Sequence, residues 1–478
     1  MTERAKITWV YVLTALFLVA NFYLVLQKDI YWLFLLPLVL IVFYFYLVSL
    51  DKVLLFITFF TPLAVNISDL EMGLGVSLPT EPLMFGVLLI FIANLIFENK
   101  YDKRLANNPI SYVIYFGLLW MMLTTLTSEL PIVSVKYLLS RLWFIVPFYF
   151  VAALVFSKIS NIKKFLWLYM IALLMVITYT LIMHSRYGFE EEAGHWVMSP
   201  FFNDHTAYGA ALAMFFPVIV GFMFYPGSTG KQRFLASVVF GIMVIGIILS
   251  YGRAAWISVV VALGVFVVIW LRIKFYWIAI FVTIFIGAFF LFQQQIIDRL
   301  EKNKQDSSAN FVEHIQSIYN ISSDASNLER INRWQAAIRM FEDRPIVGWG
   351  PGTYQFMYAP YQRSKEKTII STNLGDKGNA HSEYLGPLAE MGLPGMLLFL
   401  LLMIVVIYQG LKVYKNGNRE VKFLSMMATL GLITYFAHGI LNNFLDTDKL
   451  SVPFWGFIAI IVALDIYHVE KEPEQVEE

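Results

Sequence analysis

Long apolar runs recur along most of this chain, and they constrain its fold more than any other feature. Most approach the 20 or so residues that a helix needs to cross a hydrocarbon core of roughly 30 Å, where no water can satisfy backbone groups. The sequence predicts fourteen spans, at 8–26, 30–49, 53–67, 82–97, 110–127, 137–156, 165–184, 207–225, 234–250, 255–271, 275–292, 383–408, 423–441 and 453–468. We therefore expect an all-α polytopic membrane protein with about fourteen (12 to 14) transmembrane helices.

The composition supports this class and excludes others. Apolar residues make up 59% of the chain and charged residues 14%, too few to cover the surface of a water-soluble globule. The net charge of +1 provides no positive field for phosphate neutralisation, so nucleic acid is not an expected partner. The absence of cysteine excludes disulfides and thiolate chemistry.

The distribution of Lys and Arg between the predicted loops indicates the orientation of the chain. Positive residues in short loops favour the cytoplasmic side of a membrane. With the N-terminus in the cytoplasm, eighteen Lys and Arg fall on the inner side, and five fall on the short outer connections, namely Lys28, Lys136, Arg186, Arg253 and Lys449. This asymmetry predicts an even number of spans with both termini in the cytoplasm.

One outer connection, residues 293–382, is far longer than the others. Loops of this length are usually functional or disordered. It divides the chain into N-terminal helices (1–200), helices that carry the Arg253 turn (201–292), the large outer loop (293–382), C-terminal helices (383–468) and a disordered cytoplasmic tail (469–478).

The large loop carries a helix signal of its own. Ser326 and Glu329 have the spacing of a capping box, and Pro345 is expected to end the helix. The periodic apolar positions that predict its buried stripe are Ile331, Trp334, Ile338 and Phe341.

Three arginines lie on the faces of this helix away from the stripe. Arg330 and Arg333 are three residues apart and therefore neighbours, which suits a diphosphate, and Arg339 follows on the same helix. The alternative interpretation is a solvated amphipathic helix, for which such charges are ordinary.

Two further outer positions could carry chemistry. Arg253 lies in a tight turn after Gly252, where its guanidinium could bind a phosphate or extend to lipid headgroups. Asn379 can cap the following helix and place His381 in its first turn, where the helix dipole keeps the imidazole neutral and able to accept a proton. The alternative for His381 is an interfacial polar residue with an ordinary partner.

The remaining polar candidates are less specific. Asp204 and His205 precede the eighth span, where they could bind sugar hydroxyls or cap that helix. Arg141 lies near the outer end of the sixth span, at a depth that requires a phosphate or carboxylate partner. Glu383 and Glu390 are seven residues apart on one face of a helix.

Three other features have simpler interpretations. Pro387 is expected to kink the helix that carries the two glutamates. Asp446 and Asp448 have a metal-site spacing, but acidic residues in short loops are common, and we expect no metal ligand there. The glycines at 348–352 lack the Lys-Ser/Thr end of a phosphate loop, so they indicate a turn.

Together these motifs resemble the O-antigen ligase and polymerase superfamily, over roughly residues 200–465. The resemblance lies in the order of the elements, with one large loop before the last three spans, and in Gly-Arg253-x-x-Trp, Arg330-x-x-x-Trp334, Asp343-Arg-Pro345, Gly348-x-Gly350-Pro-Gly352, His381-Ser-x-Tyr384 and Glu390-x-Gly392.

The resemblance implies a GT-C-like enzyme of the bacterial inner membrane with a periplasmic active site. Its members transfer a glycan from undecaprenyl diphosphate to a glycan or lipid A core acceptor, without a metal or nucleotide cofactor. It further implies that Arg253 and Arg330 bind the diphosphate and that His381 activates the acceptor hydroxyl. We expect substrate contacts at nearby polar residues, namely Arg333, Arg141, Asp204, His205, Tyr384 and Glu383.

The chemistry of the transfer agrees with these residue types. Fixed guanidiniums stabilise the charge of a leaving diphosphate, and no pair of carboxylates indicates a covalent two-step route, so the transfer is expected to invert the anomeric centre. Ligase, polymerase and protein O-glycosylation variants stay open, as do two other classes. A flippase for lipid-linked oligosaccharides would show two related halves, and a scaffold protein would not depend on Arg253 or His381.

Overall fold

The computed structural model describes residues 3–29, 31–67, 75–97, 101–274, 325–363 and 378–469, with single positions at 284, 287 and 291. Its contacts divide the chain into two compact units, Met1–Leu54 and Leu55–Glu478. The first unit contains α1 (Glu3–Lys28), the 3₁₀ turn η1 (Trp32–Leu35) and α2 (Leu36–Val48), and α3 (Leu50–Phe60) runs across the boundary.

The second unit is built almost entirely of helices in its described part. A short antiparallel hairpin of β1 (Val65–Ile67) and β2 (Val76–Leu78) follows the 3₁₀ turn η2 (Thr61–Leu63). The helices are α4 (Thr80–Phe97), α5 (Lys103–Ala106), α6 (Pro109–Leu126), α7 (Pro131–Ile145), α8 (Ala152–Val155), α9 (Ile159–Ser185), α10 (Glu191–Gly194), α11 (His205–Met223), α12 (Gly230–Ile248), α13 (Arg253–Trp270), α16 (Ala325–Asp343), α17 (Tyr354–Met357), α18 (Leu385–Asn416), α19 (Arg419–His438) and α20 (Asp448–Ala463). The π-helical turn η3 (Val146–Val151) joins α7 to α8, η4 (Ala359–Tyr361) follows α17, and η6 (Leu464–His468) extends α20.

Eleven helices within the described residues are long and apolar enough to cross a membrane. They coincide with eleven of the predicted spans, which confirms an all-α polytopic membrane protein. The predicted span 275–292 lies almost wholly outside the described residues. The predicted span 30–49 corresponds to η1 followed directly by α2, which has 13 residues. The predicted span 53–67 is wrong in extent, because α3 has 11 residues and ends at Phe60. Pro62 lies in η2 at the end of α3, where its missing N–H and its ring stop the α-helix.

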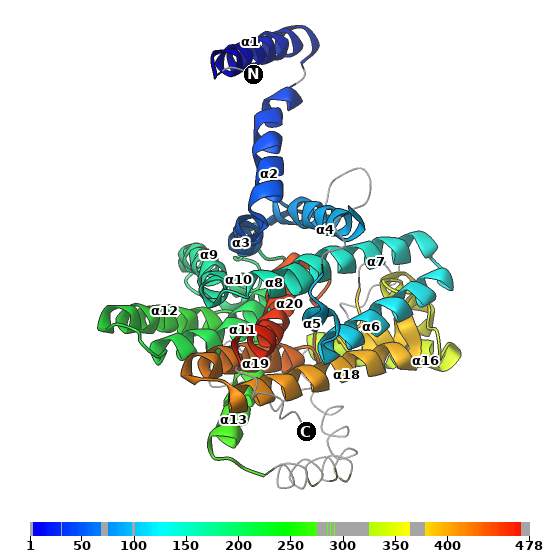
Figure 1. Cartoon of the computed structure of the whole chain (residues 1–478). Coiled ribbons are helices and arrows are strands. Elements are labelled where there is room, and N and C mark those ends of the chain that lie inside the picture. The colour runs from blue at the N-terminus through cyan, green and yellow to red at the C-terminus, as the bar shows by residue number, and fades with distance from the viewer. Residues whose placement is uncertain are drawn as a thin grey trace, which may run out of the picture. The chain divides into compact units, whose positions relative to one another are not determined.

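Small residues let the central helices of the second unit approach closely. Helix α19 packs against α11, α13, α18 and α20, as Figure 1 shows for the orange and green helices. A Cβ on Gly431 of α19 would lie 2.8 Å from the Met214 carbonyl of α11 and 2.4 Å from the Phe457 ring of α20. In a lipid environment, such close backbone packing is the main force that holds helices together.

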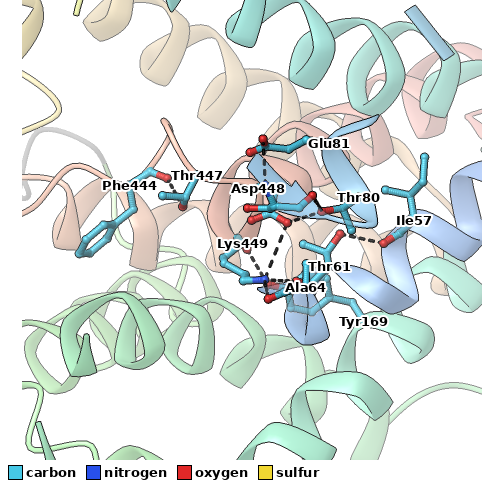
Figure 2. A network of polar contacts seen from close by, with 11 residues as sticks. Ile57, Thr61, Ala64, Thr80, Glu81, Tyr169, Phe444, Thr447, Asp448 and Lys449 are labelled. Carbon is cyan, nitrogen blue, oxygen red and sulfur yellow. Dashed lines mark hydrogen bonds and ion pairs between the residues drawn. The ribbon is translucent and has the colours of Figure 1, made fainter. Parts of the chain in front are cut away.

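A buried polar network fixes the start of α20, as Figure 2 shows. Lys449, expected in an outer loop, lies instead in the first turn of α20, and its ammonium donates to the carbonyls of Thr61 and Ala64, each at 2.6 Å. These carbonyls end a helical segment, where a cation is favourable. Asp448 accepts from the Thr80 hydroxyl at 2.6 Å, whereas Asp446 is exposed, so the two carboxylates of the metal-like spacing have different surroundings.

Helix α18 is kinked at Gly392, not at Pro387 as expected. Gly392 has φ +68°, and a Cβ there would clash with the Ile346 carbonyl. Pro387 lies in the first turn of α18, where a proline removes no helical hydrogen bond. The glycine loop packs on this kink, because the N–H of Gly350 donates to the Glu390 carbonyl at 2.8 Å. The loop is therefore a packing turn, in line with the sequence interpretation.

Candidate active site

Helix α16 positions two of the predicted arginines, and its buried face differs from the expected one. The helix ends before Pro345 as predicted. Its buried positions, however, include Ala336, Ala337 and Met340, whereas Ile338 is 41% exposed. The small alanine side chains allow α16 to pack closely on α18. The predicted stripe was drawn from large apolar residues and therefore missed these alanines.

Arg333 faces the protein interior, which corrects the prediction that it lies beside Arg330 on an outer face. Its guanidinium forms a buried ion pair with Glu329 at 2.8 Å. It also donates to the Asn379 carbonyl at 3.2 Å and lies 5.0 Å from the centre of the Tyr358 ring. Arg330 is partly exposed. Arg333 is thus suited to hold the segment before His381, and Arg330 to meet a ligand.

His381 lies in a turn before α18 rather than in its first helical turn. Its φ is +47°, its N–H donates to the Asn379 side-chain oxygen at 3.1 Å, and its carbonyl accepts from the Trp334 indole at 3.3 Å. The N-cap residue of α18 is Tyr384, and the Ser382 hydroxyl accepts from the N–H groups of Tyr384 and Leu385, each at 3.3 Å. The expected Asn379 cap of this helix is therefore wrong, and Asn379 shapes the turn instead.

The imidazole of His381 is held in its neutral form. Burial, together with the guanidiniums of Arg330 and Arg333, lowers its pKa to about 3, and Asp204 and Glu329 oppose this only in part. A neutral imidazole was expected, but its cause was not. Burial and the positive charges of Arg330 and Arg333 lower the pKa of the imidazole, whereas the sequence had suggested the dipole of the following helix.

A side-chain contact links the start of α11 to the turn before α13, close to Arg330. Asp204 caps α11 by accepting from the N–H groups of Thr206 and Ala207 at 2.7 and 2.8 Å, as the capping alternative predicted. The Nδ1 atom of His205 lies 3.0 Å from the Ser250 carbonyl. Arg253 begins α13 three residues after Ser250 and is partly exposed.

The structure brings most of the predicted residues into one region. Asp204, Arg330 and Arg333 act electrostatically on His381, and Arg330 also acts on His205. Arg253 follows three residues after Ser250, whose carbonyl contacts His205. The region combines cations, a neutral imidazole and a carboxylate that are only partly buried, apart from Arg333.

Arg141 and Glu383 form a neighbouring buried cluster with protein partners. Arg141 donates to the Leu445 carbonyl and to the Tyr137 hydroxyl. One oxygen of Glu383 accepts from the Tyr435 hydroxyl at 2.5 Å and from the Leu445 N–H at 3.0 Å. Burial raises the pKa of Glu383, while Arg141 opposes the rise. These contacts fix the turn before α20, so both residues are suited to positioning it.

An apolar groove of about 690 Å³ opens beside His381. Ser382 and Tyr384 line it from the turn that carries His381, and Trp334 lines it from α16. The Tyr384 hydroxyl donates to the Phe436 carbonyl at 2.9 Å, so the aromatic ring of Tyr384 is the part that lines the groove. The remaining lining residues come from α13, α18, α19 and the turn after α19, and are Val261, Val265, Leu385, Met403, Ile407, Ile433, Phe436, Ala437 and Ile440.

His438, at the end of α19, was missed from the sequence. It is 1% exposed, and neither ring nitrogen has a hydrogen-bond partner within the described residues. Arg330 and Asp204, which also face His381, are the charges that act on it. An ionisable residue inside a predicted span is by default a candidate for function, and that signal could have identified it.

Part of the chain is similar to known proteins. A family model described as O-antigen ligase matches residues 238–400, which include Arg253, Arg330, Arg333 and His381. An uncharacterized protein of Haemophilus influenzae is 21% identical over 243 residues, which cover 50% of this chain and 59% of that protein. The chain thus matches about three fifths of the relative's length. The family-model match shows that residues 238–400 are similar to O-antigen ligases, and it supports a membrane enzyme of the ligase or glycosyltransferase type.

Proposed function

We propose that this protein transfers a glycan from undecaprenyl diphosphate to an acceptor hydroxyl at the periplasmic face of the bacterial inner membrane. The observation that carries the proposal is the apolar groove lined by Ser382, the residue after His381, together with the electrostatic effect of Arg330 on His381. A polyprenyl diphosphate has a long apolar chain, which suits the groove, and a dianionic head, which suits the guanidinium of Arg330. The O-antigen ligase match supports lipid-linked glycans as the general substrate class.

The donor is proposed to bind with its lipid in the groove and its diphosphate at Arg330 and Arg253. Residues of α13, α18 and α19 line the groove and supply apolar contact area. Arg330 is partly exposed, and it precedes by one helical turn Trp334, which lines the groove and donates to the His381 carbonyl. A guanidinium can bind phosphate oxygens in a bidentate manner, which fixes the leaving group in orientation as well as in charge.

The transfer itself is proposed to be a single displacement. The acceptor oxygen forms a bond to the anomeric carbon, the bond from that carbon to the diphosphate oxygen breaks, and the electron pair leaves with the diphosphate. His381 takes the proton of the acceptor hydroxyl. Fixed guanidiniums stabilise the leaving charge without reorganisation. Attack opposite the leaving group inverts the anomeric centre, and the step requires no metal.

The test is an assay with purified protein in lipid nanodiscs, an undecaprenyl diphosphate glycan as donor, and lipid A core or free glycan as acceptor. Wild-type protein is expected to form a mass-shifted acceptor and free undecaprenyl diphosphate in equal amounts. His381→Ala is expected to form neither while it stays folded. Transfer by this variant at the wild-type rate would refute the role of His381, and movement of the donor across the bilayer without transfer would favour a flippase.

A further inference from the structure

The turn that follows α19 contains buried polar groups without partners. Both ring nitrogens of His438, the Asn442 side-chain nitrogen and the Asn443 side-chain oxygen have no hydrogen-bond partner within the described residues. His438 and Asn442 are only 1% and 2% exposed. A buried polar group without a partner is unfavourable, so the resting protein keeps these side chains at a cost in stability.

The surroundings of this turn indicate what could supply the missing partners. The charges that act on His438 are Arg330 and Asp204, which also act on His381. The neighbouring residues Ala437 and Ile440 line the apolar groove. The turn therefore borders both the apolar groove and the group of charges around His381, where the diphosphate and the first sugar that it carries are proposed to lie.

The unpartnered atoms also match the chemistry of a sugar. An uncharged imidazole offers one donor and one acceptor, the Asn442 amide nitrogen donates, and the Asn443 amide oxygen accepts. A saccharide hydroxyl both donates and accepts, so neighbouring hydroxyls can satisfy such a mixed set. A phosphate cannot, because it only accepts.

We propose that His438, Asn442 and Asn443 form a saccharide subsite that binds hydroxyl groups of the donor sugar next to the diphosphate. The subsite rests on the proposed function and names the part of the substrate that this turn recognises. Entry of the sugar requires the turn to open at its groove side, where Ile440 is 52% exposed. The unsatisfied groups favour this opening, because the bound sugar replaces contacts that the closed turn lacks.

The experiment compares two lipids, undecaprenyl diphosphate and undecaprenyl diphosphate N-acetylglucosamine, for binding to protein in nanodiscs. Wild-type protein is expected to prefer the lipid that carries the sugar by roughly tenfold or more, since each net hydrogen bond contributes up to about tenfold and the subsite offers several polar groups. His438→Phe and Asn442→Leu keep the volume and remove the polar atoms. Both are expected to lose the preference, to retain affinity for the bare diphosphate and to melt at or above the wild-type temperature.

Thr434→Val is the matched control, on the same helix one turn earlier. Thr434 is equally buried, but its hydroxyl already donates to the Gly431 carbonyl at 2.7 Å, so this variant is expected to keep the preference. A variant at His438 or Asn442 that melts well below wild type, or that weakens both lipids equally, overturns the subsite. Retained lipid preference with a raised KM for the acceptor overturns the donor assignment. Wild-type protein that binds neither lipid overturns the proposed function as well.

Discussion

Removal of one partner from the buried ion pair between Glu329 and Arg333 is expected to destabilise the site strongly. Both side chains are nearly inaccessible, at 5% and 7% exposure, and their charged atoms lie 2.8 Å apart. In Glu329→Leu the guanidinium stays buried without its carboxylate, which costs about 3 to 5 kcal/mol when one partner of a buried pair is removed. The matched control is Glu129→Leu, because Glu129 pairs with Arg344 on the surface, at 42% and 32% exposure.

The assay is reversible unfolding in dodecylmaltoside and SDS mixtures, followed by tryptophan fluorescence. Glu129→Leu is expected to lose less than about 1 kcal/mol of unfolding free energy, as surface pairs do. Adding Arg333→Met to Glu329→Leu should restore part of the loss, because no charge then remains buried. The doubly substituted protein should still transfer poorly, since the Asn379 carbonyl has lost its donor. Equal losses for Glu329→Leu and Glu129→Leu would refute the reasoning.

Three further expectations concern the donor site and the neighbouring cluster. Arg330→Lys should lower kcat/KM by roughly tenfold or more in steady-state transfer at unchanged protein level, because an ammonium cannot replace a bidentate fork; wild-type turnover would exclude that role. The raised pKa of buried Glu383 means that wild-type protein loses stability as pH rises above 4.5 towards the folded pKa. Glu383→Gln should lack this decline in thermal unfolding, and identical pH profiles would contradict it. Val265→Trp fills the groove and should raise the donor KM several-fold, whereas Leu397→Trp, in a separate apolar groove between α6 and α18, should not; equal effects would argue against the lipid groove.

The spans could be predicted from sequence because lipid leaves the backbone few choices. A run such as 207–225 must be helical to satisfy its own N–H and C=O groups, and α11 follows it within two residues at each end. The same argument overestimated the length of the helix at 53–67. The apolar composition continues through Pro62, but the α-helix ends at Phe60. Hydropathy indicates whether a segment can lie in lipid, whereas the residue at which a helix ends depends on its local hydrogen bonds.

The site was predictable in its residue types and less so in its geometry. Arg330, His381 and Asp204 were identified one by one, and the structure brings them within electrostatic range of each other. The inward direction of Arg333 could not be inferred, because it depends on the carbonyl of Asn379, 46 residues further along the chain. Contacts of this kind arise from tertiary packing, which helical periodicity does not encode.

We expect charge to couple the binding of the donor to the activation of the acceptor, and this coupling can be measured. Without donor, burial and the guanidiniums of Arg330 and Arg333 hold the pKa of His381 at about 3, so the imidazole is neutral but a weak base. A diphosphate bound at Arg330 cancels part of this positive field and raises the pKa of His381 towards the operating pH, where a general base works best. The acid limb of kcat should therefore lie at a higher pH than that of kcat/KM for the donor, because only the former reports the donor complex. If the acid limbs of kcat and kcat/KM fall at the same pH, the bound diphosphate does not act on His381. The general base and the diphosphate site would then be independent of each other.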